Sequence, residues 1–116
     1  MRHKKIKYSI GSSPSHRKSL LRNLAIEVID HGRIKTTHTK CKAVKPFVEK
    51  LITLAKTDSV GNRRLAFKKL NNKEAVKTLF EVAGNYKDRN GGYTRILRLA
   101  ESRVGDGSDM SFIGLV

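Results

Sequence analysis

The chain has 116 residues, and its 25 lysines and arginines against 10 aspartates and glutamates give a formal net charge of +15. A charge this large repels itself within one domain, so it is typical of proteins whose charge is neutralised by a nucleic acid or an anionic membrane. No apolar run approaches the roughly 20 residues that span a bilayer, which disfavours the membrane. The single cysteine, Cys41, excludes an internal disulfide.

Residues 1–14 are predicted to form a basic arm in front of a single domain that spans residues 15–116. Seven fixed positive charges precede Glu27, the first acidic residue. A segment this polar buries too little apolar surface to offset the entropy lost on ordering, so the arm should be disordered without a partner. It leads into Gly-Ser-Ser-Pro-Ser rather than the apolar core of a signal peptide, which indicates a cytoplasmic protein.

A first helix is predicted to begin at Ser15, whose hydroxyl can accept a hydrogen bond as the N-cap, with Pro14 limiting the helix upstream. Apolar residues then recur at helical spacing up to Ile29, and Gly32 follows where a left-handed C-cap is expected. Ile26 faces away from this apolar stripe and is a candidate contact for a partner.

A short strand and a second helix should follow. Residues 33–37 alternate basic and β-branched side chains, the pattern of a strand with Arg33 and Lys35 on one face. The second helix contains Pro46, which should either kink it or mark its true start because proline lacks an amide hydrogen.

Two shorter helices are predicted next. Thr57 or Asp58 should cap a helix that ends at Leu70, and the pair Asn71-Asn72 separates it from a fourth helix. The apolar spacing of that fourth helix stops at Gly84.

The C-terminal third is predicted to form a β-hairpin. Strand patterns at residues 93–100 and 110–116 flank a turn at residues 105–108, whose sequence is Gly-Asp-Gly-Ser. One face of the sheet should pack on the helices, and the other is open to a neighbour. The expected fold is therefore α+β, with about four helices packed on a small, mostly antiparallel sheet.

The candidate contacts to RNA are basic residues of the arm and the domain, together with one tyrosine beside a glycine pair. Lysine and arginine neutralise phosphates, while histidine and tyrosine rings can stack on exposed bases. Lys68 and Lys69 add a further basic helix face. The candidate set is Arg2, His3, Lys4, Lys5, Lys7, His16, Arg17, Lys18, Arg22, Arg33, Lys35, Arg63, Arg64, Arg89, Tyr93, Arg95 and Arg98.

Metal and catalytic chemistry are weakly supported. His31, His38 and Cys41 lie close in sequence, but they lack a fourth ligand and a paired cysteine spacing, so no metal or other cofactor is expected. No spacing brings two histidines together as an acid and a base, and the carboxylates are scattered. No catalytic residue is assigned.

Six blocks of the chain resemble the family of the seventeenth-numbered protein of the bacterial large ribosomal subunit. They are MRH at 1–3, SHR at 15–17 with LRNLA at 21–25, IKTT at 34–37, LITLAK at 51–56, NRRLA at 62–66 and GGYTRI at 91–96.

This resemblance implies an α+β, non-catalytic component that binds large-subunit ribosomal RNA. It also implies a place near the peptide exit region, among other ribosomal proteins. The chain departs from the family pattern at Ser12, where many members have an arginine, and at Pro14, which is not typical. One phosphate contact is therefore expected either to be missing or to be supplied by Lys18. The basic positions carried over from the family are Arg2, His3, His16, Arg17, Arg22, Lys35, Arg63, Arg64 and Arg95.

Two other classes of function stay open on the residues alone. A free-standing nucleic-acid-binding protein, for DNA packaging or RNA annealing, would have the same net charge. A small ribonuclease would need His16 or His38 in a catalytic pocket.

Overall fold

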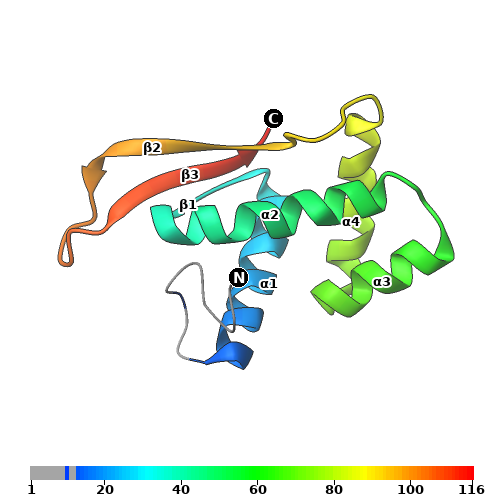
Figure 1. Ribbon diagram of the computed structural model, residues 1–116, viewed down its shortest axis with the longest axis horizontal. Coiled ribbons are helices and arrows are strands. Elements are labelled where there is room, and N and C mark those ends of the chain that lie inside the picture. The colour runs from blue at the N-terminus through cyan, green and yellow to red at the C-terminus, as the bar shows by residue number, and fades with distance from the viewer. Residues whose placement is uncertain (1–9, 11–12) are drawn as a thin grey trace, which may run out of the picture.

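The computed structural model of the protein describes Ile10 and residues 13–116; the rest of the predicted arm lies outside the described residues. Helices and strands follow one another as predicted, and the α+β fold is confirmed (Figure 1). The elements are α1 (Pro14–His31), β1 (Arg33–Thr37), α2 (His38–Ala55), α3 (Val60–Leu70), α4 (Lys73–Ala83), the 3-10 helix η1 (Gly84–Tyr86), β2 (Thr94–Ser102) and β3 (Asp109–Leu115).

The sheet has three antiparallel strands in the order β1-β3-β2. The predicted hairpin is confirmed as β2 and β3, and its far end projects beyond the helices (Figure 1). The C-terminal strand β3 lies between the other two. Its pairing with β1 is a long-range contact that no local pattern of the sequence predicts.

Helices α1 and α2 pack against one face of the sheet, and α2 lies along it (Figure 1). Helices α3 and α4 pack on α1 and α2 instead. Ile34, Ile96 and Ile113 occupy neighbouring positions on the three strands and belong to the same apolar cluster as Val44 and Val48 of α2. Burial of aliphatic surface is the main force that holds the layers together. None of the helices described here is long and apolar enough to cross a bilayer.

Two predicted helix caps are wrong by one or two residues. The N-cap of α1 is Ser13, whose side chain accepts a hydrogen bond from the amide of His16, and Pro14 is the first helical residue. Proline suits that position because the first helical amide has no partner within the helix. The N-cap of α3 is Ser59, whose side chain accepts a hydrogen bond from the amide of Asn62, while the carboxylate of Asp58 binds Arg63.

The packing of the core decides the place of Pro46 in α2 and the role of Ile26 in α1. Helix α2 begins at His38, so Pro46 lies inside it and does not mark its start. The buried residues Val44 and Val48 on either side of the proline hold the helix against the core. Ile26 is not a free partner contact, since its half-buried side chain packs against the apolar cluster.

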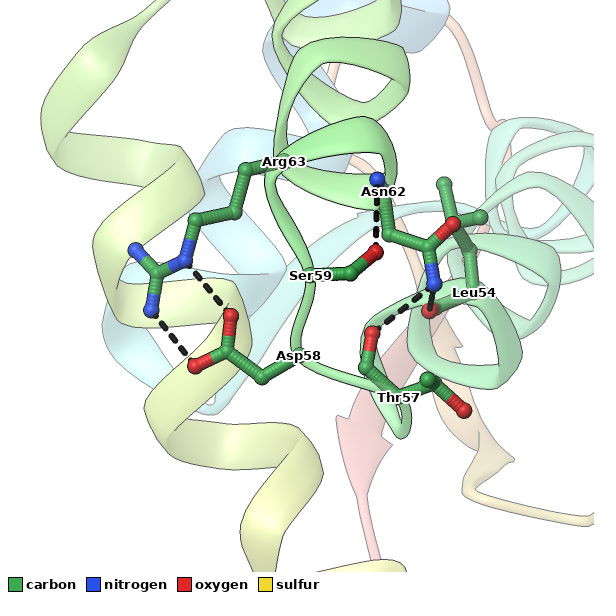
Figure 2. A network of polar contacts seen from close by, with 6 residues as sticks. All are labelled: Leu54, Thr57, Asp58, Ser59, Asn62 and Arg63. Atoms are coloured by element: carbon green, nitrogen blue, oxygen red, sulfur yellow. Dashed lines mark hydrogen bonds and ion pairs between the residues drawn. The ribbon is translucent and has the colours of Figure 1, made fainter.

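A polar network joins the end of α2 to the start of α3 (Figure 2). The side-chain amide nitrogen of Asn62 donates to the carbonyl oxygens of Leu54 at 3.2 Å and Thr57 at 2.8 Å. The guanidinium of Arg63 binds both carboxylate oxygens of Asp58, at 2.7 and 2.9 Å. Because carbonyls at a helix end otherwise lack partners, these bonds fix the angle at which α3 leaves α2.

Candidate nucleic-acid interface

A basic groove lies where α1, α2 and α3 meet. It has a volume of about 270 Å³ and is lined by Lys18, Phe47, Leu65, Lys68 and Lys69, none of them acidic. We call it the helical groove. Three lysines converge here on a floor formed by an aromatic and an aliphatic side chain, an arrangement that suits a phosphate backbone with its sugars.

Arg22 extends the positive charge of the helical groove along α1. Its Nε donates to the backbone carbonyl of Lys69 at 3.1 Å, which ties α1 to the C-terminal end of α3. The sequence places Lys18 and Arg22 one turn apart, and the structure adds the lysine pair about fifty positions later. The sequence predicts Lys68 and Lys69 as a further basic helix face outside the main candidate set, and the structure places them in the helical groove beside Lys18.

The two arginines of the NRRLA block have different roles. Arg63 is held by Asp58, and its Cζ lies 4.6 Å from the centroid of the Phe80 ring, so it braces α3 against α4. Hydrogen bonds from this arginine hold the pKa of Asp58 below its usual value. Both arginines line an apolar groove of about 340 Å³ between α3 and α4, together with Phe67 and Val76. Arg63 thus holds α3 to Asp58 and Phe80 by contacts within the described residues, whereas Arg64 contributes its exposed charge to the groove.

Three predicted cations share the outer face of the sheet, opposite the helices. Arg33 and Arg95 both pair with Gly114 of the central strand, one on each side, and Lys35 pairs with Phe112 two positions away. All three side chains are exposed. The prediction that Arg33 and Lys35 lie on one face is confirmed by this register.

Tyr93 is in the core, contrary to the expectation that it stacks on RNA. Only 2% of the residue is exposed, and its ring meets Tyr86 edge to face at 5.4 Å between centroids. Its hydroxyl accepts from Thr53 at 3.4 Å and Lys56 at 3.3 Å, while its amide donates to Glu49 at 2.9 Å. No open ring face is left for a base, so Tyr93 leaves the candidate set.

Arg89 and Arg98 already have partners within the protein. Arg89 donates to the carbonyl oxygen of Gly92 at 3.1 Å and so closes the loop before β2. Arg98 binds Asp109 at 2.8 Å across the hairpin, on the opposite side of β2 from Arg95. The structure does not bring these two arginines into the groove or onto the outer sheet face.

The remaining candidates lie at or before the start of α1. His16 and Arg17 occupy its first turn, close in sequence to Lys18 of the helical groove. The arm residues Arg2, His3, Lys4, Lys5 and Lys7 lie outside the described residues.

His38 and Cys41, two of the side chains weighed for metal or catalysis, have structural contacts. Nδ1 of His38 lies 2.7 Å from the hydroxyl of Ser111, and the thiol of Cys41 donates to the Ser111 carbonyl at 3.6 Å. Burial raises the pKa of the Cys41 thiol to about 11, so it is protonated at neutral pH and a poor nucleophile. Within Ile10 and residues 13–116, no group of three potential ligands is placed to hold a metal ion.

A small basic α+β domain with cations gathered in a groove and on an open sheet face defines a structural nucleic-acid-binding protein. Residues 20–116 match the sequence profile of the family described as ribosomal protein L17, and the chain belongs to this family. The chain is also 50% identical to the large ribosomal subunit protein bL17 of Acidobacterium capsulatum over 117 aligned residues, which cover 100% of this chain and 72% of that protein. As a ribosomal protein it is a structural component and not an enzyme, which removes the ribonuclease alternative.

Proposed function

We propose that this protein is a structural constituent of the large ribosomal subunit that binds and organises ribosomal RNA. The helical groove carries this proposal. It collects Lys18, Lys68 and Lys69 from two helices far apart in sequence, with Arg22 beside them and no acidic residue in its lining. Membership of the ribosomal protein L17 family indicates that the bound RNA is ribosomal RNA of the large subunit.

The contacts we propose position RNA and do not read its sequence. Lysine ammonium groups bind phosphate oxygens as point charges, and each neutralised phosphate releases counterions. Two RNA segments, one in the helical groove and one on the outer sheet face, would be held at a distance set by the rigid core. Arg64 of α3, and His16 and Arg17 at the start of α1, extend the proposed contact surface.

The position near the peptide exit region is the finer part of this proposal. It is supported by the resemblance of the six sequence blocks and predicts ribosomal proteins of that region as neighbours. Chemical crosslinking of purified large subunits tests it, because crosslinked peptides identify the neighbours directly. Neighbours from elsewhere on the subunit would refute the position and leave RNA binding intact.

Sedimentation of cell lysate tests the proposal as a whole. We expect the protein to migrate in equal numbers with large subunits and to stay with them through a high-salt wash, because many phosphate contacts act together. Migration at the top of the gradient, or with DNA, would instead favour a free-standing nucleic-acid-binding protein.

Removal of residues 1–9 should weaken RNA binding without unfolding the domain. The truncation takes away four lysines and arginines but keeps Ile10, which is only 8% exposed, and Ser13, the N-cap of α1. Loss of four phosphate contacts should lower the slope of log affinity against log salt by about three. Titration of ribosomal RNA at several salt concentrations measures the slope. A truncated protein that melts far below the full chain would contradict the division into arm and domain.

A further inference from the structure

The outer face of the sheet combines positive charge with exposed apolar surface. One row across the three strands holds Arg33, Gly114 and Arg95, and the next row holds Lys35, Phe112 and Leu97. Leu97 is 45% exposed. An exposed leucine beside other apolar side chains is typical of a surface that a partner covers. These two rows contain no acidic side chain.

The guanidinium of Arg33 lies over an aromatic ring. Its guanidinium carbon lies 4.7 Å from the centroid of the Phe112 ring, close enough for a cation–π contact. Arg33 is an exposed residue on the face of the sheet opposite α1 and α2, so its guanidinium is accessible to a ligand. A stacked guanidinium of this kind offers a planar surface and hydrogen-bond donors together.

Gly114 makes this placement possible. A Cβ atom at position 114 would lie 3.2 Å from Cγ of Arg33 and 3.3 Å from the carbonyl oxygen of Gly32. The missing side chain therefore lets the stem of Arg33 cross β3 toward Phe112. The sequence shows a glycine in a strand, and only the register between β1 and β3 reveals its use.

The face continues toward the hairpin end as a hollow of about 640 Å³. Lys35 and Phe112 form its near side, and Leu99 and Met110 lie farther along the hairpin. The apolar surface thus extends beyond Arg33 and Phe112 to at least Leu99 and Met110. Its lining carries two cations, Lys35 and Arg103, and one acidic side chain, Glu101. Lys35 lies at the near end beside the two rows that contain no acid, so the occupant of this end should be anionic and should carry flat apolar groups.

We propose that the outer sheet face binds a single-stranded stretch of RNA. One base stacks on the guanidinium of Arg33, and the flanking phosphates contact Lys35 and Arg95. A duplex presents mainly phosphates and sugars and would leave Leu97 and the stacked pair unused, whereas unpaired bases stack on such surfaces. This inference rests on the proposed function and adds the kind of RNA that this face takes.

Replacement of Arg33 by lysine tests the stacking, because Arg33→Lys keeps the positive charge and removes the planar guanidinium group on which a base would stack. The probes are a uridine homopolymer of about ten nucleotides and an RNA duplex of equal length. We expect affinity of the full chain for the single strand to fall about fivefold, with no change for the duplex and no change in the salt slope. Arg98→Lys is the matched control and should alter neither affinity, because Arg98 lies on the opposite side of β2 from Arg95 and is paired with Asp109.

Gly114→Ala tests the positioning of Arg33. It should reduce single-strand affinity to the level of Arg33→Lys while leaving duplex affinity unchanged, and adding it to Arg33→Lys should have no further effect. If Arg33→Lys weakens both probes equally, or neither, the stacking proposal is wrong. RNA binding through the helical groove would still stand in that case, because it is measured by the duplex.

A photo-crosslinking amino acid at position 97 identifies the occupant inside the assembled subunit. We expect an adduct with an unpaired ribosomal RNA nucleotide. An adduct with a neighbouring protein, or with a base-paired nucleotide, would overturn the proposal even if the sedimentation experiment succeeds.

Discussion

Replacement of Tyr93 by alanine should lower the free energy of unfolding by about 3–5 kcal/mol. The buried ring packs against Tyr86, and Lys56 Nζ lies 5.4 Å from its centroid. The truncation leaves a cavity beneath β2 and removes the acceptor for Thr53 and Lys56. Urea denaturation followed by circular dichroism measures the loss.

Tyr93→Phe is the control for this change. It keeps the ring and removes only the hydroxyl, so the loss should be about 1 kcal/mol. RNA affinity of the folded protein should be the same as that of the unchanged chain. If Tyr93→Ala instead melts normally and loses affinity for RNA, the tyrosine stacks on RNA as its sequence context predicts, and its buried position is wrong.

Reversal of charge in the helical groove should nearly abolish specific RNA binding. The triple variant Lys18→Glu, Lys68→Glu, Lys69→Glu removes three phosphate contacts and adds repulsion. At about 1.5 kcal/mol for each charge-assisted contact, affinity should fall on the order of a thousandfold. Filter binding with large-subunit ribosomal RNA measures the affinity, and gradient sedimentation shows whether the variant still enters subunits.

The matched control carries the same change of net charge elsewhere. Lys50, Lys77 and Lys87 are exposed and line neither the helical groove nor the outer sheet face. Their replacement by glutamate should weaken binding far less, since only long-range attraction is lost. Equal losses in the two triple variants would mean that net charge binds the RNA and that the helical groove has no special role.

Local patterns in the chain predict most of the elements. Periodicity places four helices, alternation places β1, and the glycine-rich turn at residues 105–108 predicts the pairing of β2 with β3. These succeed because a helix or a hairpin is stabilised by contacts between residues close in sequence. The caps were less certain: the stretches at residues 13–15 and 57–59 each offer more than one side chain that can accept the same bond.

The candidate site was predicted less completely than the fold. Arg33 and Lys35 were placed on one face because alternation along a strand is local. Arg63 and Tyr93 were predicted as free contacts, whereas Arg63 is paired with Asp58 and lies over Phe80, and Tyr93 is buried against Tyr86. The contacts with Phe80 and Tyr86 depend on elements that the local sequence pattern does not bring together. A basic or aromatic residue looks the same in sequence whether it faces solvent or the core.

By itself, then, the sequence determined the charge, the order of the elements and the class of partner, because each depends on composition or on neighbours a few residues away. Tertiary structure alone decided which cations act together. It set α3 against α1, which brings Lys68 and Lys69 to Lys18, and it placed β3 between β1 and β2, which lays Arg33 over Phe112. Both arrangements follow from burying the apolar faces of α2 and the sheet. That burial depends on the whole core, so it cannot be predicted from any one segment of the sequence.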